Sequence, residues 1–260
     1  MLLLPLALKA LSTAIIVVAA AYVAERTRPF LAAMVLSLPV SAGPGYVMLA
    51  LDQPPPFIAA AALASIVANA SIVPAVLAYA WLANRGHGVA VSLAGLLGGW
   101  FGLALITRHV EWTLASALLL NAVWFAIGMV ASRRWLNARP LGRPAARWFD
   151  IPIRVTLVVS LVVFVVSISS SIGPAATGLL ALLPVAYSSF IILMHRRLGG
   201  PAVAAALCNG LLMLVGFIGF LVAIQVFASR GQVWLGIAVG LATPVIWSLI
   251  VLAASRFRAS

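Results

Sequence analysis

Leu38-Pro39-Val40 and Leu183-Pro184-Val185 are the same tripeptide 145 residues apart, and they belong to a longer duplication. The segment from about Pro29 to Leu96 aligns without gaps with the segment from about Pro174 to Leu241. Proline, glycine and arginine matches are informative, because alanine and leucine coincide easily in an apolar chain. In this frame the matches are Pro56 with Pro201, Ala59-Ala60-Ala61 with Ala204-Ala205-Ala206, Arg85-Gly86 with Arg230-Gly231, and Gly95-Leu96 with Gly240-Leu241. The sequence therefore predicts two copies of one structural unit.

The composition indicates whether the chain folds in water or in a membrane. Hydrophobic residues make up 65% of the sequence and charged residues 8%. This leaves too little polar surface to cover a water-soluble globule, whereas a bilayer requires runs of about 20 apolar residues. The apolar runs are continuous rather than alternating, so they predict helices and not the strands of a barrel. We expect an all-α integral membrane protein.

Nine membrane-spanning helices can be placed on the apolar runs. Their expected ranges are 2–24, 30–51, 57–83, 88–107, 112–132, 152–172, 174–194, 202–228 and 233–254. Residues 1–111 then form the first repeat of four helices, and residues 151–260 form the second repeat. Between them, residues 112–150 hold a spacer helix and a basic loop. The expected architecture is 4+1+4.

The net charge of +12 reflects membrane topology rather than nucleic-acid binding, because the basic residues stand at the ends of apolar runs. Cytoplasmic loops are rich in Lys and Arg. We expect the chain to lie in a bacterial inner membrane with its N-terminus outside and its C-terminus in the cytoplasm. In this orientation only Lys9, Arg108 and Arg230 face the outer side. The basic stretch from Arg133 to Asp150 is expected to contact anionic membrane lipids or, alternatively, a partner protein.

The spacer helix makes the two repeats inverted, since the second repeat enters the membrane from the opposite side. Asp52 in an outer loop corresponds in the repeat frame to Arg197 in an inner loop, so each copy carries charges suited to its own side. Inverted repeats are a recurring plan of secondary transporters, in which exchanging the conformations of two halves gives alternating access. Channels also use this plan.

The same plan places substrate sites at interrupted helices in matching positions. We expect breaks in the second helix, over residues 37–46, and in the seventh helix, over residues 183–189. Proline removes a backbone donor and glycine offers no side chain to resist unwinding. The N-terminus of a half-helix would favour an anionic group. The residues expected to line the site are Ser37, Pro39, Ser41, Gly43, Gly45, Tyr46, Pro184, Tyr187, Ser188 and Ser189.

Polar side chains in the third and eighth helices complete the predicted site. Asn69 and Asn209 are the candidate ligands, beside Ser65 and Ser71, although a buried amide can equally hold two helices together. Asn121 of the spacer helix is expected to have that second role. Lys9 and Arg154 coincide in the repeat frame and are candidates for attracting an anion at the two mouths of the pathway; Lys9 could instead snorkel to the membrane surface.

Chemistry for catalysis is not recognisable in this sequence. All four acidic residues lie at or near helix ends, so no carboxylate is expected deep in the membrane. The three histidines also lie at helix ends and are expected on the surface. Cys208 is the single cysteine and is expected to be a small buried apolar residue. We therefore expect no enzyme activity, no metal site and no cofactor.

Three resemblances extend this interpretation. Gly173-Pro174-Ala175, followed by Leu183-Pro184, resembles the Gly-Pro-Ala and later proline pattern of bacterial LrgB-type membrane proteins. The overall plan is similar to the bile-acid/sodium symporter group, whose broken helices cross at the site, but the acidic sodium-site residues of that group are not recognisable here. The stretch from Glu25 to Gln53 resembles uncharacterised bacterial inner-membrane proteins, which implies the fold and the location but no substrate.

The sequence thus predicts a secondary transporter for a small metabolite, with an anion as one candidate. It leaves homo-oligomer formation open. Two other classes also remain open: a passive channel or lipid scramblase of the same symmetry, and a non-transporting membrane subunit.

Overall fold

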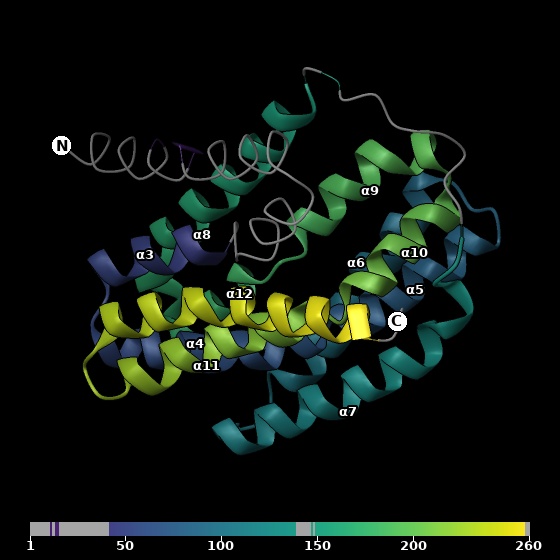
Figure 1. The fold of residues 1–260 in the computed structure, drawn as a ribbon. Coiled ribbons are helices and arrows are strands. Elements are labelled where there is room, and N and C mark those ends of the chain that lie inside the picture. Colours follow the sequence, from purple (N-terminus) through teal and green to yellow (C-terminus); the bar gives the residue numbers. More distant parts are fainter. Residues whose placement is uncertain (1–10, 12–13, 16–41, 139–146, 148, 258–260) are drawn as a thin grey trace. The chain divides into compact units, whose positions relative to one another are not determined.

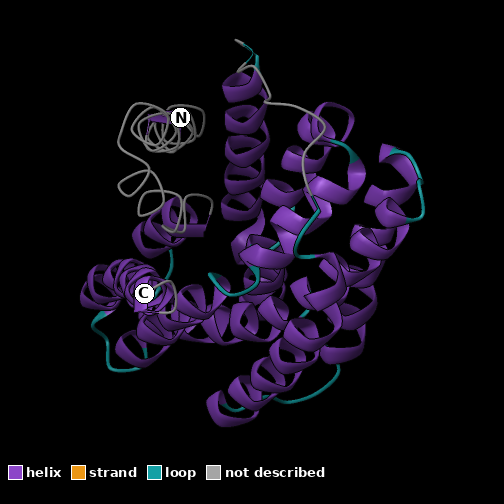
Figure 2. Cartoon of the chain, turned by 45° about the vertical axis from the view of Figure 1, so that its right-hand side comes forward, coloured by secondary structure: helices purple, strands orange, loops and turns teal. Residues whose placement is uncertain are grey.

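The computed structural model describes residues 11, 14–15, 42–138, 147 and 149–257. All regular elements in these residues are helices, as Figure 2 shows. The predicted first span lies outside the described residues except at three positions, as does the predicted second span up to residue 41. In chain order the described helices are α3 (Ala42–Asp52), α4 (Pro55–Ala70), α5 (Ile72–Asn84), α6 (Val89–Thr107), α7 (Leu114–Ser132), the 3-10 helix η1 (Arg133–Trp135), α8 (Asp150–Ala181), α9 (Val185–Leu198), α10 (Gly200–Gly210), α11 (Leu214–Ala228) and α12 (Val233–Phe257) (Figure 1).

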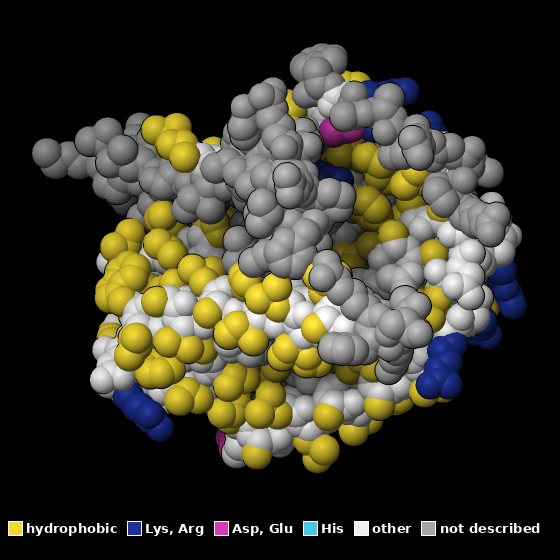
Figure 3. Space-filling model, viewed as in Figure 1, with side chains coloured by type: hydrophobic (Ala, Val, Ile, Leu, Met, Phe, Trp, Pro, Cys, Tyr) yellow, Lys and Arg dark blue, Asp and Glu magenta, His cyan; other side chains and the backbone are white. Residues whose placement is uncertain are grey.

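The lengths and apolar composition of these helices make the chain a membrane-spanning protein. Within the described residues, five helical stretches are long and apolar enough to cross a bilayer: Pro55–Asn84, Val89–Thr107, Leu114–Trp135, Asp150–Leu198 and Val233–Ala254. The bent pair α10 and α11 makes a sixth if it is counted as one span. Large apolar side chains on α12 are exposed, among them Trp234, Ile246 and Ile250, and Figure 3 shows yellow side chains along this helix.

The helix ends follow from local chemistry. Pro55 and Pro201 stand in the first turns of α4 and α10, where the missing N–H of proline has no helical partner to lose. At the end of α5, Gly86 adopts a φ of 83° and forms a Schellman motif, in which the Gly86 N–H donates to the Ala83 carbonyl and the His87 N–H to the Leu82 carbonyl. At these positions both residue types therefore mark helix boundaries.

The chain divides into two compact units. Unit 1 contains residues 1–64, 158–181 and 213–260, and unit 2 contains residues 65–157 and 182–212. In unit 1, α11 and α12 form a closely packed hairpin, and α12 also contacts α3. Tyr46 of α3 is fully buried, with its ring edge-to-face against Phe220 of α11. Gln53 donates a 2.9 Å hydrogen bond to Ser169 of α8.

In unit 2, α5 packs against α6, α7 and α10, while α9 contacts α6 and α10. Its core includes the fully buried rings of Tyr79 and Trp100. Gly99 allows the close approach of α6 to α5, because a Cβ built on it would lie 2.8 Å from the Pro74 carbonyl oxygen. The chain passes from unit 1 to unit 2 inside α4, between Ala64 and Ser65.

Several predicted spans agree with the helices to within a few residues. The predicted ranges 88–107, 112–132 and 233–254 correspond to α6, α7 and α12. The predicted spans 57–83 and 202–228 correspond to α4 with α5 and to α10 with α11, but each of these is interrupted. The predicted boundary between the sixth and seventh spans is a kink inside α8, where Gly173 has a φ of 76°.

Candidate functional site

Of the predicted site residues, Ser37, Pro39, Ser41 and Lys9 lie outside the described residues. The remainder of the predicted break in the second span falls in α3, which is a continuous helix from Ala42 to Asp52. Gly43, Gly45 and Tyr46 are all buried there.

Gly45 lines a small apolar pocket between α3 and α8 in unit 1. Its other lining residues are Ala42, Leu49, Leu161, Val162, Val165, Val166 and Ala181. None of these side chains offers a hydrogen bond, so this pocket has no group that would orient a polar substrate.

The seventh predicted span is broken at its proline. The chain leaves helical conformation after Ala181, and α9 begins at Val185 with Pro184 as its N-cap. The Ser188 hydroxyl donates to the Pro184 carbonyl at 2.8 Å, and the Ser189 hydroxyl donates to the Ala186 carbonyl at 2.9 Å. Tyr187 is half-buried. Both serine hydroxyls therefore bind the backbone of their own helix at this break.

A second break, between α4 and α5, holds a buried polar cluster in unit 2. Asn69 lies in the last turn of α4 and donates through Nδ2 to the Asn121 Oδ1 of α7 at 2.9 Å. Asn121 in turn donates to the Ile66 carbonyl at 2.7 Å and to the Ala117 carbonyl at 2.8 Å. The spacer helix is thus tied to the last turn of α4 by its asparagine, which matches the helix-joining role predicted for it.

The cluster contains buried polar atoms that have no hydrogen-bond partner in the part of the chain that the structure describes. Asn69 and Ser71 are both fully buried, and neither the Asn69 Oδ1 nor the Ser71 Oγ has a hydrogen-bond partner among the described residues. The Trp100 Nε1 of α6 is a buried donor that also has no hydrogen-bond partner among the described residues. An unsatisfied buried polar group costs about 1–3 kcal/mol, so such groups in a native fold call for a ligand, a water molecule or an ion. Asn69 and Ser71 are the strongest candidate ligands in the described structure.

Asn209 has different surroundings from Asn69. Its side chain is exposed and lies on α10. The Nδ2 donates to the Ala205 carbonyl at 2.8 Å and to the Leu136 carbonyl at 3.2 Å. Asn209 therefore joins α10 to the segment after η1, and the structure does not bring it into the Asn69 cluster.

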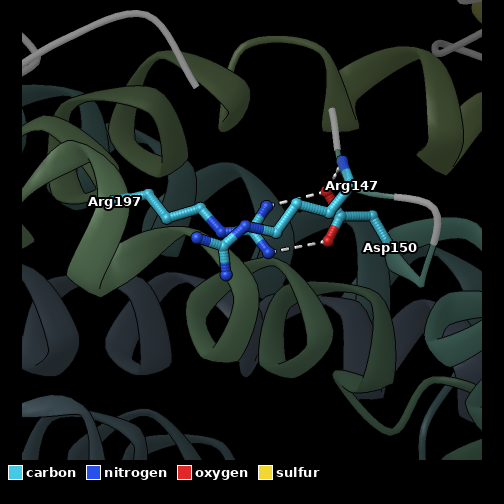
Figure 4. Close-up of polar contacts among 3 residues, drawn as sticks. All are labelled: Arg147, Asp150 and Arg197. Carbon is cyan, nitrogen blue, oxygen red and sulfur yellow. Dashed lines mark hydrogen bonds and ion pairs between the residues drawn. The ribbon is translucent and has the colours of Figure 1, made fainter. Parts of the chain in front are cut away.

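Arg154 lies in a group of charged residues at the polar ends of α8 and α9. Arg197 forms a bidentate pair with Asp150, with nitrogen-to-oxygen distances of 2.7 and 2.9 Å (Figure 4). The Arg147 backbone N–H also donates to Asp150, at 3.1 Å. The Arg154 guanidinium carbon lies 5.9 Å from the centre of the Phe190 ring.

His195 departs from the surface position predicted for it, because its side chain is 8% exposed. The Tyr79 hydroxyl of α5 lies 2.8 Å from its Nδ1. Its ring also packs on Gly200 at the start of α10. His195 is buried although it stands near the end of α9, because α5, α9 and α10 meet there. The position of His195 in the sequence does not reveal this contact.

Among the described residues, no three His, Cys, Asp or Glu side chains are grouped so as to hold a metal ion. No family model, curated protein or solved structure matches the chain.

Sequence reasoning missed the break at Ser71 and the interruption between α10 and α11. Neither contains a proline or a glycine, although Gly210 is the last residue of α10, directly before the second. The available signal was Asn69 and Asn209, because asparagine is a weak helix former that competes for backbone hydrogen bonds. Each stands within a few residues of its break.

Proposed function

We propose that this chain is a secondary transporter of a bacterial inner membrane, which moves a small metabolite by alternating access between two inverted repeats. The observation that carries this proposal is a structural match at the offset of the sequence duplication. The turn after α5 and the turn after α11 contain the same three backbone hydrogen bonds, made by Arg85, Gly86 and His87 in one and by Arg230, Gly231 and Gln232 in the other. Both glycines have positive φ angles.

The helix breaks give further support. The Ser71 N–H donates to the Ala68 carbonyl at 3.0 Å at the first break, and the Leu211 N–H donates to the Cys208 carbonyl at 3.2 Å at the second. In the proposed repeat, α4 with α5 and α10 with α11 are equivalent helices and each pair is interrupted, although Leu211 corresponds in the frame to Ile66, more than one helical turn before Ser71. Paired discontinuous helices are the feature that marks transporter sites in inverted-repeat proteins.

In the proposed arrangement the spacer helix α7 inverts the second repeat, and the arginines set the orientation. The stretch Asp150–Leu198 has 49 residues, enough for two spans of about 20 residues each. If this stretch counts as two spans and the bent pair α10 and α11 as one, the two N-terminal spans expected from the sequence bring the proposed arrangement to nine spans with the N-terminus outside. The Arg85 turn then faces the cytoplasm and the Arg230 turn faces the opposite side.

The substrate in this proposal binds at the α4–α5 break. Asn69 Oδ1 is an uncharged acceptor and the Ser71 hydroxyl can both accept and donate, so a small solute with hydroxyl or amine groups would satisfy them. Binding that relieves two unsatisfied groups supplies free energy without any charged residue in the membrane. This agrees with the placement of the acidic residues, because none of the four is expected in the middle of a span.

The test uses purified protein in liposomes. A thermal-shift screen against sugars, polyols, amino acids and carboxylates first identifies a ligand, since binding to the folded state raises its stability. Exchange of that radiolabelled ligand is then measured for the wild type, for Ser71→Ala and for the control Ser92→Ala. We expect saturable exchange in the wild type and in Ser92→Ala. In Ser71→Ala the exchange should fall at least about tenfold, which corresponds to a loss of about 1.4 kcal/mol of binding free energy.

Three outcomes would reject the transporter. Flux that rises linearly with concentration would indicate a channel. Movement of fluorescent lipids between leaflets without solute exchange would indicate a scramblase. Absence of any flux, together with a protein that copurifies through the basic loop, would indicate a membrane subunit.

A further inference from the structure

Unit 2 contains more positive charge at the ends of α8 and α9 than its neighbouring carboxylate can neutralise. Asp150 is paired with Arg197, and the side chains of the two are 12% and 14% exposed. The side chains of Arg147 and Arg197 each place a guanidinium carbon within 6 Å of the Phe149 ring centre, at 5.7 and 5.5 Å. Arg154 is close enough to add to the positive potential at Asp150.

Arg154 also has an unused donor. Its Nε is buried and has no hydrogen-bond partner among the described residues. Asp150 cannot serve all three guanidinium groups, because Arg197 already engages both of its carboxylate oxygens. We name Arg147, Arg154 and Arg197 the arginine cluster. With Asp150 included, the four side chains carry a net charge of +2.

We propose that the arginine cluster binds the phosphodiester of an anionic phospholipid headgroup. A phosphate offers several acceptor oxygens, and the planar guanidinium fork matches its geometry. Guanidinium groups also stack on aromatic rings, and the Phe149 and Phe190 rings lie beside this cluster. The site is independent of the proposed transport function.

The surroundings favour a lipid over a soluble phosphate ester. The cluster stands where the apolar part of α8 begins and that of α9 ends, and lipid phosphates lie at this level of a bilayer. Leu157 and Ile192 are exposed apolar side chains on the same two helices, 37% and 47% accessible. Leu157 is three residues beyond Arg154, about 4.5 Å along the helix axis, so acyl chains could lie along this face. Basic pockets between membrane helices recognise anionic headgroups in this way.

The test measures thermal unfolding of the full-length protein in an uncharged detergent. The probes are dioctanoyl phosphatidylglycerol, dioctanoyl phosphatidylcholine and sodium phosphate. We expect a saturable stabilisation by phosphatidylglycerol only. In the double variant R147Q/R154Q the apparent Kd should rise about 30-fold, which is about 2 kcal/mol, or about 1 kcal/mol for each arginine. The control R85Q removes an arginine that also stacks on a ring, that of Trp81, and should leave the Kd unchanged.

A second variant separates a lipid site from a structural ion pair. Asp150→Asn releases Arg197 and removes the competing carboxylate, so it should tighten phosphatidylglycerol binding while it lowers stability without lipid. A purely structural cluster predicts lost stability in all variants and no headgroup dependence in any. That result would overturn the proposal. Equal stabilisation by phosphatidylcholine would also overturn it, and so would saturable stabilisation by sodium phosphate alone.

Discussion

Gly86 and Gly231 adopt the same left-handed backbone conformation, with φ angles of 83° and 78°, at positions 145 residues apart. Each ends a helix with the same Schellman hydrogen bonds. A side chain on either glycine would meet no atom within 4 Å, so only the backbone conformation selects glycine here.

We therefore expect Gly86→Ala and Gly231→Ala to lower the free energy of unfolding by similar amounts, about 1–2 kcal/mol each, the cost of a left-handed non-glycine residue. Gly102→Ala is the matched control, because Gly102 also has open space around it but lies inside α6. That change should raise stability by up to about 1 kcal/mol. Denaturant unfolding in detergent measures all three. Equal effects of Gly86→Ala and Gly102→Ala would contradict the role of the turn.

Gly98 and Gly99 are neighbours with opposite surroundings. A Cβ on Gly99 would lie 2.8 Å from the Pro74 carbonyl oxygen, whereas a Cβ on Gly98 would meet nothing within 4 Å. We expect Gly99→Ala to cost about 1–3 kcal/mol, because α6 must move away from α5, and Gly98→Ala to be neutral or stabilising. Thermal unfolding of the two variants, side by side, tests this packing. A harmless Gly99→Ala would mean that the two helices are further apart than described.

Ser71 and Ser92 form a second matched pair, both fully buried. The Ser92 hydroxyl donates to the His87 carbonyl at 3.2 Å, while the Ser71 Oγ has no partner among the described residues. Ser92→Ala should cost about 1 kcal/mol and Ser71→Ala should be neutral or stabilising, because only the first removes a hydrogen bond. Unfolding measured without added ligand distinguishes the two. A loss in Ser71→Ala equal to that in Ser92→Ala would show that Ser71 has a structural partner.

The Tyr79 hydroxyl and the His195 Nδ1 join α5 to α9 across 2.8 Å. Tyr79→Phe leaves that nitrogen buried without its partner, so we expect a loss of about 1–3 kcal/mol in the free energy of unfolding. Tyr187→Phe on α9 removes a hydroxyl that forms no hydrogen bond among the described residues, so we expect it to be neutral or stabilising. If the two substitutions have the same effect in denaturant titrations, the hydrogen bond does not contribute to stability.

The positions of several helices could be predicted because an apolar run is a local property of the sequence. For α6 the predicted range starts one residue before the helix does, and both end at Thr107. The interruption at Ser71 was not predicted, because it coincides with a polar network that reaches α7. Asn69 pairs with a residue 52 positions away, and no local pattern shows that contact.

The candidate site could be predicted only by residue type. Asn69 was selected as a polar group in an apolar run, whereas Ser71 acquires its interest from burial and from the lack of a donor. Ser188 and Ser189 are predicted because they stand at the expected break of the seventh span, but their hydroxyls bind the Pro184 and Ala186 carbonyls at the start of α9. Whether a hydroxyl is available to a ligand depends on backbone geometry that the sequence leaves unspecified.

The bond between Asn69 and Asn121 also sets an order of events during synthesis. The α4 helix leaves the ribosome before α7, so Asn69 and the Ile66 carbonyl must wait for an amide that lies 52 and 55 residues further along the chain. At about 5–20 residues per second, this interval is about 3–10 s. During that time the polar groups of α4 have no Asn121 to bind and need water or other partners. We therefore expect α4 to settle in lipid only after the spacer helix has arrived.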